Sequence, residues 1–176
     1  MDKSPIIRLG NPELRHACVD VVFPNTQLNA ISAAMFLVMY KAKGIGLAAN
    51  QIGIRERIAV VDILEGAQPI TLINPTIVEF SGEQDDIEGC LSLPGFAHAV
   101  KRANVIKVKN FDFDGKEAII EAEGFLARAL QHEIDHLDGK VFLDRLTPLE
   151  RRLQENYIKR LVRSYKKEDK GMPFEF

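Results

Sequence analysis

The chain has 176 residues, of which 46% are hydrophobic and 27% charged, a composition ordinary for a globular protein and sufficient for one domain with a sizeable core. The net charge is −2, so no overall field favours nucleic acid, and we expect no sequence-specific nucleic-acid binding. The apolar runs are too short to cross a bilayer and the N-terminus lacks a signal-peptide pattern, which predicts a cytoplasmic protein that does not enter the membrane.

The first part of the chain predicts an extended arm followed by helices. Residues 6–9 form an apolar run that ends in the turn-forming residues 10–12, and a brief helix over 13–18 follows. Apolar residues then recur at helical spacing from Thr26 to Lys43, which predicts a helix that buries one stripe. The stripe consists of Leu28, Ile31, Met35, Val38 and Met39. We expect Gly44 to end this helix in the left-handed conformation, which costs glycine least.

Residues 44–51, Gly-Ile-Gly-Leu-Ala-Ala-Asn-Gln, are small and almost uncharged. The stretch does not follow a strand and lacks a Gly-Lys-Ser/Thr ending, which argues against a nucleotide site. Two interpretations remain equal at this point. Either the backbone comes close to a ligand, with Gln51 offering an amide donor, or the stretch is a tight buried connection.

The middle of the chain predicts strands, because β-branched runs alternate with turn residues. The linkers are too short for crossover helices, so the strands are expected to be antiparallel. The predicted strands cover residues 58–63, 70–73, 76–80, 99–110 and 118–123. Polar residues 81–86 predict a turn, and residues 112–115 predict a hairpin.

The two cysteines differ in their surroundings. One disulfide between Cys18 and Cys90 is conceivable, but in a reducing compartment a cysteine is more often a buried thiol or a metal ligand. Cys18 lies in an ordinary segment and is interpreted as structural. Cys90 lies between a glycine and a short strand that ends in proline, within Glu-Gly-Cys-Leu-Ser-Leu-Pro-Gly at residues 88–95.

A helix predicted from about Gly124 to Leu137 carries Gln-His-Glu-Ile-Asp-His at residues 131–136. Residues four apart stand one turn above each other on a helix, so His132 and His136 can bind one metal ion, with Glu133 beside it as a base. The competing interpretation is an amphipathic helix whose histidines merely pack. Leu126, Leu130, Ile134 and Leu137 form one apolar stripe, and Phe125 and Ala129 share a second stripe with the histidines.

A last helix is predicted from about 147 to 164, followed by a polar tail to residue 176. Thr147-Pro148-Leu149-Glu150 has the pattern of a capping box with proline at the first helical position. Leu153, Tyr157 and Leu161 are expected on its inner face, and its outer face is basic. Such a face is usually solvated surface, although it suits an anionic partner.

Two histidines leave a metal in need of another protein ligand, and the carboxylates that follow them have no diagnostic spacing. A thiolate from Cys90 completes a Cys-His-His site with a fourth position for water. The stretches GIGLAANQ, EGCLSLPG and QHEIDHLDG, in this order, resemble the three signature motifs of the peptide deformylases, and the likeness covers roughly residues 5 to 150.

This resemblance implies a metal-dependent hydrolase that removes the formyl group from the N-terminal formylmethionine of nascent chains. It implies an α+β fold in which antiparallel sheets pack around the histidine-bearing helix, with residues 1–176 forming a single catalytic domain that includes a C-terminal helix. The implied cofactor is one divalent metal ion, Fe²⁺ in the cell, with Zn²⁺, Ni²⁺ or Co²⁺ able to occupy the site. The implied partners are N-formylmethionyl peptides and, through the basic C-terminal helix, the ribosome.

The resemblance also implies roles for individual residues. Cys90, His132 and His136 would be the metal ligands, and Glu133 the general acid/base. Gln51 and the backbone N–H of Leu91 would be oxyanion donors, and Gly46 would meet the substrate backbone. Helical spacing adds Ile45, Phe125 and Ala129 as the pocket for the methionine side chain. Glu88, Arg102 and Asp135 would form ion pairs around the ligands.

The chain departs from the family pattern beside the substrate. Bacterial relatives often carry an acid just before the first glycine and an arginine seven residues after the cysteine, where this chain has Lys43 and Ala97. This difference points to altered contacts with the peptide beyond methionine. Two rival functions remain: a zinc endopeptidase built on the HExxH motif, and a catalytically silent relative that serves as a binding module.

Overall fold

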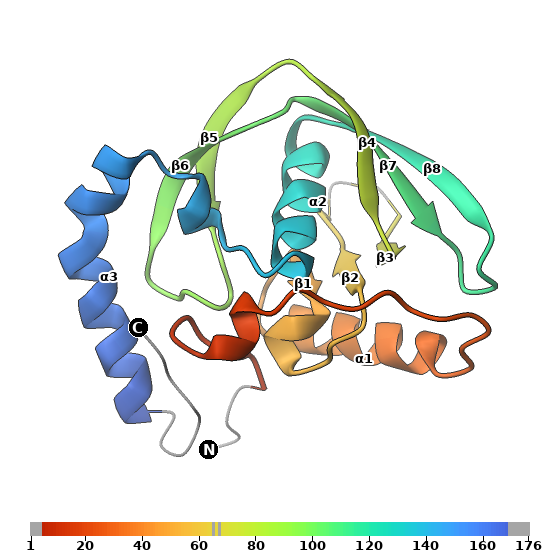
Figure 1. Ribbon diagram of the computed structural model, residues 1–176, viewed down its shortest axis with the longest axis horizontal. Coiled ribbons are helices and arrows are strands. Elements are labelled where there is room, and N and C mark those ends of the chain that lie inside the picture. The colour runs from red at the N-terminus through yellow and green to blue at the C-terminus, as the bar shows by residue number, and fades with distance from the viewer. Residues whose placement is uncertain (1–4, 65, 67, 169–176) are drawn as a thin grey trace.

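The structure of the protein is a computed structural model that describes residues 5–64, 66 and 68–168; the predicted tail at 169–176 lies outside the described residues. Within them the chain forms antiparallel sheets and α-helices, which confirms the α+β class (Figure 1). The elements in chain order are η1 (Pro12–Arg15), α1 (Leu28–Lys41), β1 (Gly46–Ala48), η2 (Ala49–Ile52), β2 (Ile58–Val61), β3 (Ile70–Ile73), β4 (Thr76–Ser81), β5 (Gln84–Gly89), β6 (Ala97–Arg102), β7 (Val105–Phe111), β8 (Glu117–Glu123), α2 (Gly124–Leu137), η3 (Phe142–Arg145) and α3 (Pro148–Glu168).

The sheet β1-β2-β3 lies between two helices. Successive side chains of a strand point to opposite faces, so Ile58 and Val60 of β2 pack with α1 while Ala59 and Val61 pack with α2. All four residues of β2 are buried. Burial on both faces explains why this strand is a continuous apolar run and not an alternating one.

Helix α1 buries a narrower stripe than predicted and ends differently. Met35 and Met39 are fully buried as expected, and Ser32 takes a buried position through a 2.8 Å hydrogen bond to Thr71. The left-handed residue at the end is Lys43, with φ of 59°, and not Gly44. The N–H of Lys43 donates to Tyr40 and that of Gly44 to Met39, which closes the helix in a Schellman motif. The expectation for Gly44 was therefore wrong by one position.

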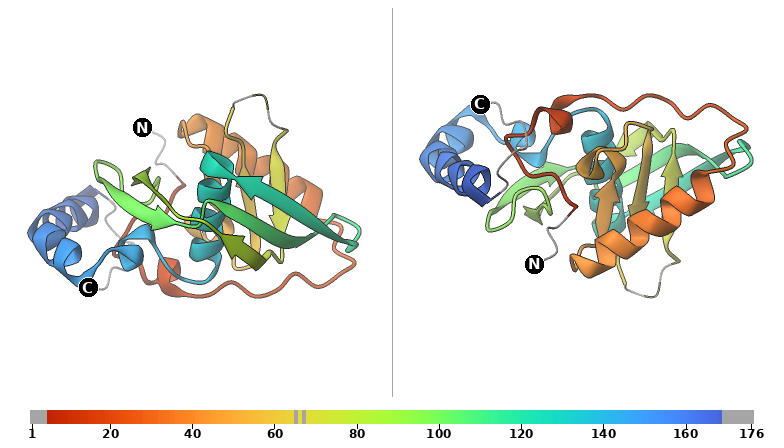
Figure 2. Two further views of the ribbon diagram at one scale, coloured as in Figure 1. Left: turned by 90° about the horizontal axis from the view of Figure 1, so that it is seen from above. Right: turned by 90° about the horizontal axis from the view of Figure 1, so that it is seen from below.

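Helix α2 stands at the centre of the molecule, with α1 and the β4-β7-β8 sheet on either side of it (Figures 1 and 2). Its bounds agree with the prediction. Every residue from Ala127 to Leu137 is buried, including the polar ones. A helix enclosed on all sides must satisfy its polar side chains internally, so these residues are the first place to look for a functional site.

Two predictions about the sheets were wrong. Residues 81–86 were expected in a turn, but Gln84–Gly89 form β5, which pairs antiparallel with β6 from Gln84 opposite Arg102 to Gly89 opposite Ala97. Residues 99–110 were expected to form one strand, but the chain breaks after Arg102 and turns from β6 into β7. The β7–β8 hairpin around residues 112–115 is as predicted. The brief helix expected over 13–18 is the shorter η1.

Helix α3 lies at one end of the molecule, beyond the β5–β6 hairpin (Figure 1). Its capping box is present: the Glu150 N–H donates to Thr147 Oγ1 over 3.3 Å, and the Thr147 N–H donates to Glu150 over 2.7 Å. The helix runs to Glu168, four residues beyond the predicted end. Of the three residues predicted for its inner face, Leu161 packs on the core and Tyr157 contacts Gly95, but Leu153 is 71% exposed; the buried residues of this face are Val162 and Tyr165. Across the described ranges, none of the helices is both long and apolar enough to cross a membrane.

Candidate metal centre

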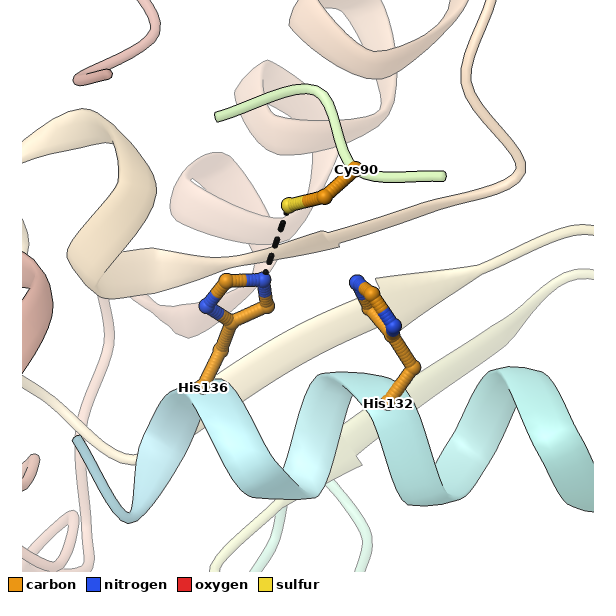
Figure 3. A group of neighbouring side chains, drawn as sticks. All are labelled: Cys90, His132 and His136. Carbon is orange, nitrogen blue, oxygen red and sulfur yellow. Dashed lines mark hydrogen bonds between the residues drawn. The ribbon is translucent and has the colours of Figure 1, made fainter. Parts of the chain in front are cut away.

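Three side chains from two distant segments meet at the centre of the molecule. His132 and His136 point from one face of α2 toward Cys90, which directly follows β5 (Figure 3). One potential ligand atom from each lies within 4.8 Å of the others, and Cys90 Sγ is 3.2 Å from His136 Nε2. Cys18 and Cys90 are both free thiols, so the disulfide alternative is excluded. The predicted Cys-His-His convergence is confirmed.

The charges around Cys90 favour its thiolate. Burial alone opposes ionisation, but His136 and His132 outweigh it and hold the pKa of Cys90 well below its ordinary value. The Ser92 N–H also donates to Cys90 Sγ over 3.4 Å. Cys18 behaves differently, because burial raises the pKa of its thiol to about 11. Cys90 is therefore the metal-binding thiol and Cys18 a structural one.

The donor set fits a divalent transition metal. The Glu88 carboxylate accepts a 2.9 Å hydrogen bond from His132 Nδ1, which leaves Nε2 of that ring with its lone pair available. A thiolate and two neutral imidazoles suit several first-row ions and leave coordination positions open. The ligand types and their burial thus describe a metal site without selecting one ion.

Glu133 lies beside the ligands in a desolvated position. It is 4% exposed, and its Oε2 has no hydrogen-bond partner among the described residues. Burial raises the pKa of Glu133 to about 7, despite the opposing effect of His132 and His136. A carboxyl group with a pKa near 7 can both accept and donate a proton at cellular pH, as a general acid/base requires.

Gly46 faces Glu133 at close range. A Cβ atom built on Gly46 would lie 2.2 Å from Glu133 Oε1, so a side chain at this position would collide with the carboxylate.

Each of the two interpretations of residues 44–51 is partly correct. Residues 46–51 are buried in β1 and η2, and the same stretch lines a pocket at the metal site.

The Gln51 amide is held in one orientation. Its Oε1 accepts a 2.8 Å hydrogen bond from the Ala48 N–H, and its Nε2 donates to Ser92 Oγ over 3.0 Å and toward Cys90 Sγ over 3.6 Å. Both ends of the amide are therefore engaged, and the Nε2 group lies beside the metal ligand Cys90. Gln51 is 2% exposed, so no solvent competes for these bonds.

A buried ion-pair network supports His132. Arg102 donates to Glu88 through two nitrogens, at 2.8 and 2.9 Å, and Arg128 donates to the same carboxylate over 2.6 Å. Burial opposes ionisation of Glu88, but the hydrogen bonds from Arg102 and His132 prevail and lower its pKa to about 2. Asp135 extends the network, because it pairs with both Arg102 and Arg145. Glu88, Arg102 and Asp135 therefore lie together as predicted.

Sequence reasoning missed Arg128. It is 3% exposed, and besides Glu88 it binds the Val100 carbonyl over 2.8 Å and Gln84 over 3.2 Å. A signal was available, since position 128 lies one turn before His132 on a helix with few charges. The partners of Arg128 could not be identified because Glu88 and Gln84 lie on β5, a strand that was not predicted.

A pocket of about 430 Å³ opens at the metal site. Its lining includes every predicted site residue except His136, which is fully buried behind it. The lining residues among the predicted set are Ile45, Gly46, Gln51, Cys90, Leu91, Phe125, Ala129, His132 and Glu133. Phe125 is 43% exposed and therefore belongs to the pocket's mouth, whereas Ala129 is buried. The pocket provides an apolar space next to a base and a metal site, as hydrolysis of an amide requires.

Comparison with known proteins gives a single consistent family. Residues 3–152 match the family model described as polypeptide deformylase. Peptide deformylase 1 of Clostridium perfringens is 52% identical over 139 residues, which cover 78% of this chain and 95% of that protein. The peptide deformylase of Hydrogenovibrio crunogenus is 42% identical over 169 residues, 96% of each chain.

A solved structure agrees with these sequences. The crystal structure of peptide deformylase from Thermus thermophilus superposes with a TM-score of 0.87 at 38% identity. The match covers 94% of this chain and 99% of that chain. The likeness therefore extends over the whole fold, including the segments that carry the metal site.

Proposed function

The chain belongs to the peptide deformylase family, and from this membership we propose the identity of its metal ion, the roles of its residues and its cellular partner. It is a metal-dependent hydrolase that removes the N-formyl group from the N-terminal formylmethionine of newly synthesised polypeptides and releases formate. The observation that carries this function is the meeting of Cys90, His132 and His136 beside Glu133. Residues 1–176 act as a single catalytic domain.

The metal ion in the cell is Fe²⁺, held by Cys90, His132 and His136. Affinity order alone would favour Zn²⁺ over Fe²⁺ for such a site, so occupancy by iron depends on metal supply and not on ligand preference. Zn²⁺, Ni²⁺ and Co²⁺ fit the same donors. When bound by these three residues, a divalent ion would lower the pKa of a water molecule from ~15.7 toward ~7 and would polarise the formyl carbonyl.

Glu133 moves the proton. With a pKa raised by burial to about 7, its carboxylate accepts the proton of the attacking water and then donates it to the departing amine. Oε2 is the atom available for this, since it has no partner among the described residues. On the other side of the carboxylate, the absence of a side chain at Gly46 leaves the space that Oε1 needs.

Gln51 and the backbone N–H of Leu91 stabilise the oxyanion that forms on the formyl oxygen. The fixed Gln51 amide supports this role, because a donor that is already oriented needs no reorganisation during the reaction. One such donor contributes ~3 kcal/mol in well-studied hydrolases. Removal of the Gln51 amide is therefore expected to lower turnover more than substrate binding.

The pocket selects the first residue of the substrate. Ile45, Phe125 and Ala129 form the apolar walls for the methionine side chain, and Gly46 meets the substrate backbone. The formyl group carries a hydrogen where an acetyl group carries a methyl. A tight space beside Glu133 and Gly46 would thus exclude acetylated chains.

The enzyme acts in the cytoplasm, where nascent chains emerge, and docks on the ribosome through α3. The exposed face of α3 supports this partner, because it presents basic side chains to solvent. These residues are Arg151, Arg152, Lys159, Arg160 and Arg163. Cosedimentation with ribosomes that is lost when they are replaced by Gln tests this partner.

The decisive experiment measures formate release from a formyl-Met peptide by the metal-loaded protein and by its Glu133→Gln variant. We expect the variant to keep the metal and to lose at least ~10²-fold in kcat, because the proton carrier is gone while the ligands remain. Equal rates would refute the role of Glu133. Cleavage of an unformylated protein would indicate an endopeptidase, and binding without any turnover would indicate a silent relative.

A further inference from the structure

Lys43 occupies a defined position at the mouth of the substrate pocket. It is the left-handed residue of the Schellman motif that ends α1, and its backbone is fixed by the hydrogen bonds of Lys43 and Gly44 to Tyr40 and Met39. The next residue, Gly44, lies against Leu91: a Cβ atom there would be 2.6 Å from Leu91 Cδ1. Lys43 is therefore held next to the loop that follows Cys90.

The Lys43 ammonium group is exposed, and no residue in the described part of the chain forms an ion pair or hydrogen bond with it. The other charged residues that line the pocket differ. Glu88, Arg128 and Glu133 are at most 5% exposed, and the first two neutralise each other. Lys43 thus provides the one solvent-facing charge among the described lining residues, and the mouth of the pocket is cationic.

From this arrangement we propose that Lys43 selects substrates with acidic side chains directly after the formylmethionine. The inference rests on the proposed function of this pocket, because it concerns the same bound peptide. An extended chain advances ~3.3 Å per residue, so with methionine in the pocket the second and third residues pass its mouth. A lysine side chain is long enough to span one or two residues of an extended peptide. The Lys43 ammonium group can therefore reach a carboxylate on the second or third substrate residue.

The size of the effect follows from solvent exposure. An exposed ion pair changes an equilibrium by about 1.5- to 5-fold, and salt screens it. Two acidic residues add to this attraction, whereas two lysines are repelled. We therefore expect kcat/KM for formyl-Met-Asp-Asp to exceed that for formyl-Met-Lys-Lys by about threefold or more at low ionic strength, with a smaller ratio at about 0.5 M salt.

The test is charge reversal at Lys43. The metal-loaded Lys43→Glu protein is compared with the wild type on formyl-Met-Asp-Asp, formyl-Met-Lys-Lys and the neutral formyl-Met-Ser-Ser. Glutamate has the same backbone cost as lysine in the left-handed region, so the fold is not further strained. We expect the Asp/Lys preference to fall about tenfold and to invert, mainly through KM, with Lys43→Gln intermediate.

Lys41 supplies a matched control. It is an exposed lysine two residues earlier, in the last turn of α1, and it does not line the pocket. Lys41→Glu makes the same change in net charge, and we expect it to alter the preference less than twofold. An equal effect of both variants, or no preference in the wild type, would overturn the inference while formyl-Met-Ser-Ser is still hydrolysed. Absence of hydrolysis of all three peptides would instead refute the proposed function.

Discussion

Gly46 is a glycine because Glu133 occupies the space where a side chain would begin. The 2.2 Å separation between a built Cβ and Glu133 Oε1 is far below contact distance, so either the carboxylate or the β1 backbone must move if any side chain is introduced. Neither φ nor a turn demands glycine here. The constraint comes from a residue 87 positions later in the chain, and no local pattern could reveal it.

The Gly46→Ala variant is expected to fold, bind metal and lose about 10²-fold in kcat, because a displacement of about 1 Å at a reacting group has that order of effect. Steady-state formate release and metal content measure the two quantities. Gly44→Ala is the comparison. Its Cβ would lie 2.6 Å from Leu91 Cδ1 and 3.2 Å from Leu91 Cγ, and at the ordinary contact distance of 3.4 Å from the Gly46 carbonyl oxygen. Because the Leu91 side chain can rotate away, we expect a loss below about threefold. Similar losses in both variants would contradict the specific role of Gly46.

Glu133 predicts a pH dependence of stability in the metal-free protein. Burial raises its pKa from 4.5 to about 7, so the folded state binds an extra proton between these pH values. The protonated Glu133 side chain therefore contributes its full stabilisation below about pH 4.5, and this stabilisation is lost as pH rises through about 7. The free energy of unfolding falls by about 3 kcal/mol over this range.

Urea unfolding of the reduced, metal-free protein at about pH 5 and about pH 7.5 measures this loss. Glu133→Gln removes the titrating group but leaves Cys90 and His132, so the difference between the two proteins isolates Glu133. We expect the fall in stability between the two pH values to be smaller in the variant by about 2 kcal/mol, because part of the full loss occurs outside this pH interval. An identical fall in both proteins would show that Glu133 is not desolvated in solution.

At the scale of elements, α2 and β5 act as one unit through Glu88. The strand supplies the carboxylate, α2 supplies Arg128 and His132, and β6 supplies Arg102. Each charge is buried, so each depends on the others for compensation. The network fixes the orientation of a metal ligand through a strand residue that lies 44 positions earlier in the chain.

Removal of the Arg128 guanidinium group tests whether the buried charges depend on one another. Arg128→Met is expected to destabilise the protein by about 3–5 kcal/mol and to speed loss of metal to a chelator about tenfold, because Glu88 then orients His132 less firmly. Arg145→Met is the control, since Arg145 has a 45% exposed side chain and pairs with Asp135. We expect it to cost about 0.5–1 kcal/mol. Equal unfolding midpoints for the two variants would contradict the network.

The elements differ in how far the sequence predicts them. The bounds of α2 were predicted because apolar periodicity, Gly124 and the histidine spacing agree with one another. The strand β5 was missed because Gln-Asp-Asp-Ile-Glu-Gly is acidic and four of its six residues are exposed, which is typical of a turn. Its strand conformation comes from pairing with β6, a tertiary contact that outweighs local preference. Arg128 was missed for the same reason.

At the scale of the whole molecule, the metal site depends on segments that local reasoning treats separately. The chemistry of three ligands and the order of three motifs predicted the Cys90–His132–His136 convergence without knowledge of the sheets. The inner face of α3 could be predicted only in part. Its amphipathic pattern allows two neighbouring stripes, and the loop after Cys90 contacts both: Tyr157 and Leu161 from the predicted one, Val162 and Tyr165 from the other.

This contact connects α3 to the substrate pocket. Tyr157 Oη donates to the Gly95 carbonyl over 3.0 Å, and Tyr165 Oη donates to the Pro94 carbonyl. Pro94, Gly95 and Phe96 line the pocket, and Phe96 also packs on the Tyr157 ring at 6.0 Å between centroids. Helix α3, which carries none of the metal ligands, thus supports the pocket wall from outside.

The double variant Tyr157→Phe, Tyr165→Phe removes both hydrogen bonds and keeps the rings. Each bond contributes about 0.5–1.5 kcal/mol, so we expect a looser wall and a KM for formyl-Met peptides raised about threefold or more. We expect kcat to change less than twofold, because the ligands and Glu133 lie on α2 and after β5. Leu153→Ala, at a 71% exposed position of α3, controls for a general effect on the helix. A fall in kcat with unchanged KM would mean that α3 supports the metal centre and not the pocket wall.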